Sequence, residues 1–355
     1  MLTSNKVTAM SPLSRKLTAL LLGLLISCSA FTAAAVELNP NHPERYVVVK
    51  GDTLWDIAGH FLRDPWLWPE IWHVNQQIAN PHLIYPGDTL VLTYVNGKPR
   101  LMLERGSRDV KLSPQMRSTP LDTAIPAIPM DAILPFLSRP YVVGKGELDQ
   151  APYVVDFADD RLMGGAGHRA YVRSIETNEH SSYSVVRPGK AYKDGDTGEI
   201  LGYEALYVGD AQLQQTGDPA TLLLTSTEIE TLAGDRLLPA TEDSVRQNFY
   251  PKAPDRDVRG NIISIIHGVL QVGQHQVVVL DRGSEDGLQP GDVLAIDHRG
   301  ETVPDSVTPN PRDTVKLPNE KAGSLMVFRT FPRVSFGLIL AATRAIHIMD
   351  PVHNP

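Results

Sequence analysis

The feature that most constrains the fold is a succession of short apolar runs between Tyr141 and the C-terminus. Runs such as Tyr203–Val208, Ile262–Ile266 and Val277–Leu280 have the length of single strands and end at Gly, Asp or Pro. No helical periodicity interrupts them, and the 28 prolines and 27 glycines of the chain favour turns and short strands over long helices. The sequence therefore predicts a mainly β structure from residue 141 onward.

An internal similarity divides this β-rich region in two. Four pairs of segments match in the same order along the chain: Arg187–Gly189 with Arg282–Ser284, Leu201–Val208 with Ala322–Arg329, Leu222–Thr227 with Leu338–Thr343, and Asp235–Leu238 with Asp350–Val352. Similarity that preserves order is typical of duplicated structural units, although any two β hairpins share some of it. We predict two related β-rich modules, residues 141–245 and 258–355, joined by a linker at residues 246–257.

The stretch before these modules has a different character. Prolines recur there without a clear strand or helix pattern, at Pro99, Pro114, Pro120, Pro126, Pro129, Pro135 and Pro140. Such spacing is typical of an extended chain. We therefore predict a Pro-rich linker over residues 98–140, with one short amphipathic piece near Asp131–Leu137.

Residues 1–35 have the features of an export signal. Arg15 and Lys16 precede the apolar run Leu17–Ile26, and a series of small residues ends at Ala35. We predict a signal peptide that is cleaved near Ala35, which places the mature chain in the periplasm or cell envelope. An uncleaved membrane anchor is an alternative, because the apolar stretch nearly reaches the length of a membrane span.

Cys28 is the only cysteine of the chain and lies inside this leader. Leu25–Cys28 resembles a bacterial lipobox, so a lipoprotein anchored through Cys28 is the other alternative to cleavage near Ala35. A single cysteine excludes an intramolecular disulfide, a cysteine-based zinc site and cysteine catalysis in the mature chain. No second long hydrophobic segment follows, so no membrane span is predicted in the mature chain.

A compact segment between the leader and the linker alternates strand and helix signals. Tyr46–Val49 is a β-branched strand, and Thr53 with Asp56 fits the capping box that starts a helix. The apolar residues that follow recur at helical spacing: Leu54, Ile57, Ala58 and Phe61. Pro69 is well placed in the first turn of a second helix, and Leu90–Leu92 is a second strand. The expected order is β-α-α-β, a small α+β domain.

This order and its landmark residues resemble the LysM family of glycan-binding modules. The landmarks are, in chain order, Tyr46–Val48, Gly51–Leu54, Ile57, Ala58, Asn75 and Ile84–Leu90. We therefore assign a LysM domain to residues 36–97, with its core at residues 45–93. The stretch Leu62–Pro69 is longer and more aromatic than in a minimal LysM. The whole chain resembles exported proteobacterial proteins with an N-terminal LysM domain and an uncharacterised β-rich region.

By this resemblance the ligand is a β-1,4-linked glycan with N-acetyl groups, such as the N-acetylglucosamine-containing strands of peptidoglycan. The glycan is expected in a shallow groove between the loop after the first strand and the loop before the second. The groove residues are Gly51, Asp52, Thr53, Leu54, Asn80, Pro81, Leu83, Ile84, Tyr85 and Pro86. Trp66 is a further candidate for stacking on a sugar face. The alternative for Leu54 and Ile84 is a purely structural place in the core.

The rest of the chain lacks the local signatures of common hydrolases. It contains no His-Glu-x-x-His pair and no Gly-x-Ser-x-Gly elbow, so no catalytic residue is predicted. A glycosidase carboxylate pair has no local signature and stays open, for example at Asp156 and Glu176. Asp194–Glu199 alternates carboxylates like a calcium loop but lacks EF-hand spacing, which favours a plain turn. No metal and no cofactor are predicted.

Together these features predict a non-catalytic peptidoglycan-binding protein whose LysM domain anchors the β-rich modules at the cell wall. The net charge of −8 excludes nucleic acid as an expected partner, because phosphates require a basic face. Two other classes stay open. One is a peptidoglycan hydrolase or amidase with an unrecognised catalytic domain. The other is an envelope assembly protein whose residues 141–355 bind a protein partner.

Overall fold

The computed structural model describes residues 36–72, 84–104, 125–137, 142–240, 249–266, 271–305, 307–308 and 312–355. The predictions for the leader, with Cys28 and Ala35, and for Asn80, Pro81 and Leu83 lie outside these residues. Within the described ranges, no helix combines the length and the apolar character that a bilayer span requires.

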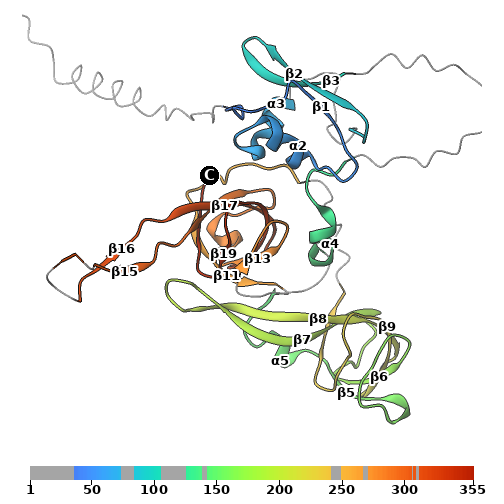
Figure 1. Ribbon diagram of the computed structural model, residues 1–355. Coiled ribbons are helices and arrows are strands. Elements are labelled where there is room, and N and C mark those ends of the chain that lie inside the picture. The colour runs from blue at the N-terminus through green and yellow to red at the C-terminus, as the bar shows by residue number, and fades with distance from the viewer. Residues whose placement is uncertain are drawn as a thin grey trace, which may run out of the picture. The chain divides into compact units, whose positions relative to one another are not determined.

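The N-terminal module is a three-stranded antiparallel sheet with helical segments between its first two strands (Figure 1). Its elements are β1 (Arg45–Val47), α2 (Leu54–Phe61), the 3-10 helix η1 (Pro65–Leu67), α3 (Trp68–Trp72), β2 (Thr89–Val95) and β3 (Lys98–Glu104). The central strand β2 pairs with β1 on one side and β3 on the other. The predicted β-α-α-β order is confirmed.

Strand β3 extends the sheet beyond the boundary predicted at residue 97. Residues Lys98–Glu104 pair with β2 along their whole length, so they form a strand and not the start of the linker. Asn96 and Gly97 have φ angles of 52° and 75°, which suit a two-residue hairpin turn. Asn-Gly between apolar runs is a strong hairpin signal. Pro99, two residues later, instead favoured the prediction of a linker.

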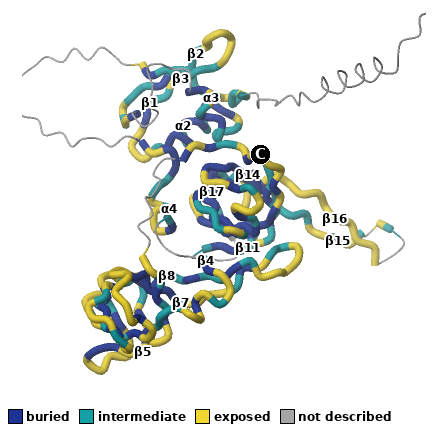
Figure 2. Tube along the Cα trace, turned by 180° about the vertical axis from the view of Figure 1, so that it is seen from behind, coloured by how far each residue is buried: buried dark blue, intermediate teal, exposed yellow. Residues whose placement is uncertain are grey.

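The core of this module comes from the amphipathic faces of its helices. These large side chains are almost completely buried: Leu54, Ile57, Phe61, Trp68, Ile71, Leu90 and Leu101. Figure 2 shows the buried residues gathered inside each module, with the exposed ones on the turns and strand ends. Trp68 and Trp72 both belong to this core and contact each other, with ring centroids 5.3 Å apart.

The first β-rich module contains six main strands. They are β5 (Tyr153–Phe157), β6 (Arg169–Arg173), β7 (Ser182–Lys193), β8 (Ile200–Gln215), β9 (Ala220–Thr227) and β10 (Arg236–Pro239). All pairings are antiparallel, and the additional pairing of β8 with β9 closes these strands into a ring. Short elements flank the ring: β4 (Val142–Val143), α5 (Glu147–Gln150) and the 3-10 helix η3 (Ala158–Asp160).

The second β-rich module is a closed six-stranded barrel. Its strands are β11 (Arg259–Ile265), β13 (Val277–Leu280), β14 (Val293–His298), β17 (Glu320–Thr330), β18 (Ser335–Ala342) and β20 (Pro351–His353). Two small sheets and a turn accompany it: β12 (Gln271–Val272) with β19 (Ile346–His347), β15 (Thr302–Pro304) with β16 (Thr314–Lys316), and η4 (Ser284–Asp286). The predicted mainly β region is confirmed.

One helix from the predicted linker packs against this barrel. Residues Met130–Leu137 form α4, where the sequence predicts a short amphipathic piece. Its Phe136 ring lies 6.3 Å, between centroids, from the rings of both Phe328 and Phe336. The linker therefore contains an element with its own place in the apolar core of the barrel.

The two β-rich modules connect their strands in the same order. If the six strands of each are counted along the chain, the first pairs with the second and sixth, and the fourth pairs with the third and fifth. The second pairs with the fifth and the third with the sixth in both modules. The pairings around the two rings are thus identical, which supports the predicted relation between the modules.

Matching details occur at matching places. Asp235 and Asp350 each stand one residue before the last strand, and the preceding residues, Gly234 and Met349, have φ angles of 92° and 74°. The backbone carbonyls of the two aspartates accept hydrogen bonds from the first strands, at 2.9 and 3.0 Å. Each aspartate also accepts, on its side chain, the backbone N–H three residues earlier. We infer that the modules arose by duplication.

The strand pairing gives a different alignment from the sequence comparison in two places. The register aligns Arg187 with His298 and not with Arg282. The second place is the pair of glycines Gly209 and Gly323. Val185 pairs with Gly209 in the first module, and Ile296 pairs with Gly323 in the second, with a register shift directly after both pairs. Gly323 therefore corresponds to Gly209, although the match of Leu201–Val208 with Ala322–Arg329 places it opposite Gly202. Sequence matching can shift along a long strand because its apolar residues resemble one another. The turns at Asp235 and Asp350 have distinctive residues and do not allow such a shift.

We predict that Asp235 is a main stabilising residue of the first β-rich module. Its carboxylate is 3% exposed and accepts from Arg187 Nε and Nη2 at 2.8 and 2.9 Å. Because Asp235→Ala leaves this guanidinium without its partner, unfolding should become easier by about 3 kcal/mol, measured by urea denaturation.

The matched control is Asp218→Ala, which breaks the ion pair with Arg173. That pair is open to solvent, with side chains 36% and 50% exposed, so the denaturation midpoint should hardly move. Equal effects of the two substitutions would contradict the role given to Asp235.

Candidate functional site

The two loops that the LysM resemblance implicates lie side by side. The backbone N–H of Val48, after β1, donates to the carbonyl of Asp88, before β2, at 2.9 Å. In return the N–H of Gly87 donates to the carbonyl of Val48 at 2.8 Å. The β1 loop and the Ile84–Asp88 turn are therefore joined by backbone hydrogen bonds.

Two carboxylates fix the shape of these loops. Asp52 accepts the Val49 N–H at 2.8 Å and the Tyr46 hydroxyl at 2.9 Å, and Asp88 accepts the Tyr85 N–H at 3.0 Å. Burial, and then the hydrogen bond to Asp52, raise the pKa of Tyr46 to about 12. Asp52 is thus committed to the turn, and its role is to hold the loop backbone in place.

Thr53 is also structural. Its hydroxyl oxygen accepts the backbone N–H of Asp56 at 3.1 Å, while the Asp56 carboxylate accepts the Thr53 N–H at 3.2 Å. These reciprocal bonds are the predicted capping box at the start of α2, and Thr53 is 3% exposed.

Gly51 presents an exposed backbone in the loop after β1. It has a φ angle of 101°, which L-residues rarely adopt. Apart from its two chain neighbours, no atom of the residues that the structure describes lies within 4 Å of the position that a Cβ would take. The loop is therefore open to solvent at this point, which suits close approach by a flat sugar ring.

The apolar candidates divide into covered and exposed residues. Leu54 and Ile84 are completely buried, so in this conformation they are core residues, which was the alternative to a role in glycan binding. Tyr85 is 36% exposed and Pro86 is partly exposed, and both border the open part of the loop. Trp66 is partly buried against the apolar cluster that contains Trp55 and α4, so it is less suited to stacking than Tyr85.

The chain's own segment Ile125–Ile128 covers the place between the two loops. The Ile125 N–H donates to the carbonyl of Ile84 at 2.9 Å. From the other loop, the N–H groups of Leu54 and Trp55 donate to the carbonyls of Pro126 and Ala127, at 3.0 and 3.2 Å. The side chains of Ile125, Ala127 and Ile128 are buried. The sequence analysis placed this segment in an extended linker, and backbone contacts of this kind carry no side-chain motif.

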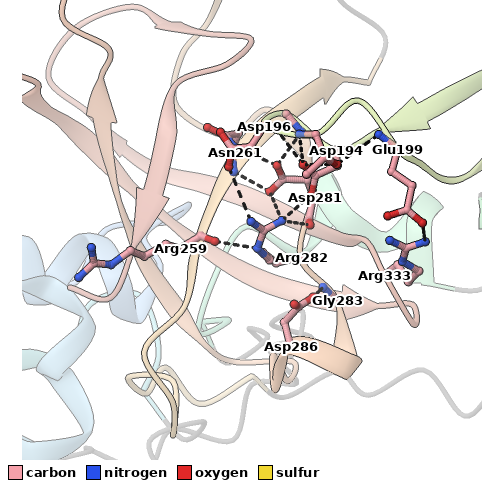
Figure 3. Close-up of polar contacts among 12 residues, drawn as sticks. Asp194, Asp196, Glu199, Arg259, Asn261, Asp281, Arg282, Gly283, Asp286 and Arg333 are labelled. Atoms are coloured by element: carbon pink, nitrogen blue, oxygen red, sulfur yellow. Dashed lines mark hydrogen bonds and ion pairs between the residues drawn. The ribbon is translucent and has the colours of Figure 1, made fainter.

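A second polar site surrounds the turn between β7 and β8 (Figure 3). One oxygen of Asp194 accepts the backbone N–H groups of Asp196 and Thr197 at 2.9 and 2.7 Å. The other accepts Arg282 Nη1 at 3.0 Å. The calcium-like spacing of this loop thus produces a turn whose first carboxylate binds backbone amides and a guanidinium. These hydrogen bonds, that from Thr197 first, lower the pKa of Asp194 to about 2.

Further bonds tie this turn to the second barrel. Asp281 is buried and accepts the backbone N–H of Gly195 at 3.0 Å, the Asn261 backbone N–H at 2.6 Å and the Asn261 amide at 3.0 Å. Glu199 forms an ion pair with Arg333 at 2.8 Å. This arrangement is a structural clamp, and its signal in the sequence is only a set of charged residues far apart in the chain.

Comparison with known proteins agrees with the N-terminal fold. Residues 46–93 match the family model described as LysM domain. The segment is similar to an uncharacterized protein of Bacillus subtilis (strain 168), YqbP, at 45% identity over 58 residues. That match covers 14% of this chain and 26% of the relative, so the chain spans about a quarter of the length of the relative. The protein therefore contains a LysM domain, a module that binds glycans of the peptidoglycan or chitin type.

We predict that the Asp194 clamp makes stability depend on acid. The folded-state pKa of Asp194 is about 2, below its usual 3.8, so the stabilisation is complete above the usual value and is lost as the pH falls towards 2. Asp194→Asn should lower the melting temperature at pH 6, and the difference from the parent should shrink as the pH falls from about 4 to about 2.

Asp196→Asn, which alters a carboxylate that is 64% exposed in the same turn, serves as the control and should change the melting temperature little. A constant difference between Asp194→Asn and the parent across this pH range would contradict the role of the carboxylate charge.

Proposed function

We propose that the protein is a non-catalytic peptidoglycan-binding protein that uses its LysM domain to anchor two β-barrel modules at the cell wall. The observation that carries the proposal is the LysM fold at residues 46–93, with its two loops joined by backbone hydrogen bonds beside Gly51. The function of the family supplies the ligand class.

The chemistry of the loops fits an N-acetylated sugar. An N-acetyl group offers one amide donor, one carbonyl acceptor and a methyl group, so backbone amides and a small apolar floor suffice to bind it. Gly51 presents accessible backbone, and the exposed ring of Tyr85 offers a face for sugar C–H groups. Leu54 and Ile84 supply an apolar floor wherever the segment Ile125–Ile128 is displaced.

The leader supports a location outside the cytoplasm. Residues 1–35 combine a basic start, an apolar run and a small-residue end, so the mature chain is proposed to reside in the periplasm or cell envelope. A lipid attached to Cys28 would place it at a membrane surface, and mass spectrometry of the mature N-terminus distinguishes the two.

Co-sedimentation with purified sacculi tests the function. The mature chain, residues 36–355, should appear in the pellet, and Gly51→Trp should weaken its binding at least tenfold, because the indole blocks the open loop. Binding should change little between low and physiological salt, since the LysM domain is acidic and is not expected to depend on charge attraction.

Gly97→Trp is the matched control. Gly97 also has a positive φ angle, 75°, and free space at its Cβ position, but it lies at the tip of the β2–β3 hairpin. It should bind like the parent. A folded parent that stays in the supernatant would refute the proposal, and release of soluble muropeptides would replace it with a hydrolase.

A further inference from the structure

Three side chains of the second barrel converge on one point. His298 ends β14, His347 ends β19, and Asp350 lies just before β20. One ligand atom from each lies within 4.8 Å of the other two. The Nδ1 atom of His298 is 3.4 Å from one Asp350 oxygen, and the Nδ1 atom of His347 is 3.8 Å from the other.

In the described part of the chain, one ring nitrogen of each histidine is buried without a hydrogen bond. The Nδ1 atoms of His298 and His347 are shielded from solvent and make no hydrogen bond to any residue that the structure describes. Asp350 is 2% exposed, and its two oxygens accept one backbone N–H each, from Arg299 at 3.0 Å and from His347 at 2.8 Å. Two buried nitrogens without hydrogen bonds beside a buried carboxylate require an explanation, because such groups are normally hydrogen-bonded.

The first β-rich module has different residues at the positions that correspond to this cluster. There the strand register puts Arg187 where the second barrel has His298, counted from the pairs Val185–Leu237 and Ile296–Val352.

Leu232, three residues before Asp235, corresponds to His347, three residues before Asp350. The Arg187–Asp235 ion pair of the first module therefore occupies the position where the second module has Asp350 with two histidines.

This exchange removes the permanent positive charge. Asp235 is neutralised by a guanidinium, whereas the ion pairs found for Asp350 in the described part of the chain involve only His298 and His347. A buried carboxylate requires a compensating cation. Either a proton on an imidazole or a metal ion between the three groups provides it.

The geometry favours the metal ion. With bonds of about 2.0–2.1 Å, neighbouring ligand atoms of tetrahedral zinc are roughly 3.3 Å apart, which the 3.4 Å distance from His298 to one Asp350 oxygen nearly matches. The 3.8 Å distance from His347 to the other oxygen is longer and has to shorten when the ion binds. Two imidazole nitrogens and one carboxylate oxygen form a usual zinc ligand set, which leaves one position for water. We propose that His298, His347 and Asp350 bind a divalent transition metal of the zinc type, which fastens β14, β19 and β20 together.

Zinc titration of the metal-free mature chain tests this site. In competition with a chromophoric chelator, one equivalent of Zn²⁺ should bind, and it should raise the melting temperature, since the ion binds only the folded barrel. The double variant His298→Arg with His347→Leu installs the residues of the first module. It should fold and lose zinc affinity roughly a hundredfold or more.

His353→Ala is the matched control, because His353 pairs with Asp297 at 3.3 Å outside the cluster. It should bind zinc like the parent. The proposal is wrong if the folded parent binds no zinc at micromolar concentration, or if the double variant binds it equally well. In the first case a protonated imidazole compensates Asp350, which the ring ¹⁵N shifts would show.

A separate observation concerns the glycan site, and this inference rests on the proposed function. Three backbone hydrogen bonds join the segment Ile125–Ile128 to both loops, and they use the N–H groups of Leu54 and Trp55 and the carbonyl of Ile84. Leu54 and Ile84 belong to the predicted groove, so the segment uses backbone groups that a glycan there would use. We infer that this segment is an internal occupant of the groove and that glycan binding requires its release.

The occupant imitates the chemistry of the ligand. It presents carbonyl and amide groups to the loops and buries apolar groups, as an N-acetylated glycan would with its amides and methyl groups. If only a fraction of molecules has the segment released, the apparent affinity falls by that fraction. The covered state therefore weakens binding without any change in the groove itself.

The full mature chain with Ile125→Asp tests the release. Ile125 is 4% exposed, so an aspartate there should expel the segment and tighten binding to sacculi or chitin oligomers at least threefold. In the parent, ligand should speed hydrogen exchange at the Ile125 N–H, which loses its acceptor. Leu134→Asp, at a position of α4 that is 46% exposed, controls for the added charge.

The outcomes separate this inference from the proposed function. If the parent and Ile125→Asp bind equally well, the groove does not need release and the inference is wrong, while glycan binding stands. If no folded variant binds any glycan, the proposed function itself fails.

Discussion

Both β-rich modules depend on a buried aspartate at the entry to the last strand. Asp235 and Asp350 receive a backbone amide on the side chain and another on the main-chain carbonyl. These bonds fix the position of β10 and of β20 against the first strand of each module, where the ring of strands closes. Because an unpaired buried carboxylate is costly, each module must also supply a cation, and the two modules do so with different residues. A constraint on folding thus becomes an opportunity for a new site.

The LysM domain shows a similar economy of polar groups. Asp52, Thr53, Asp56 and Asp88 are occupied in holding two loops and one helix start, which leaves backbone and one aromatic ring for recognition. Recognition by backbone is tolerant of sequence, and this explains why a segment of the same chain fits between the loops. The linker region is therefore part of the domain's behaviour, since it contributes both this segment and α4.

Local signals in the sequence were sufficient for the LysM domain. The capping box joins Thr53 and Asp56, three residues apart, and the helix face repeats within two turns, so a single window contains the evidence. The mainly β character and the matching turns at Asp235 and Asp350 were equally local. Long-range features were not predictable in this way. Strand β3 was not predicted because Pro99 favours a linker. Gly323 was aligned with Gly202 instead of Gly209 because the apolar residues of a strand resemble one another. The partners of Ile125 and the convergence of His298 with His347 depend on the closed barrel and the folded loops.

Gly209 and Gly323 set a limit on how these barrels can vary. In each, the carbonyl of the neighbouring strand, from Ser226 or Ala341, occupies the space that a side chain would need. Two backbones can approach this closely only where one of them lacks a side chain, so each ring requires glycine at this position. Exposed strand positions are free to drift towards any polar residue, whereas these two glycines cannot change without opening the wall. The two modules therefore share one close backbone contact that any change at their exposed positions leaves in place.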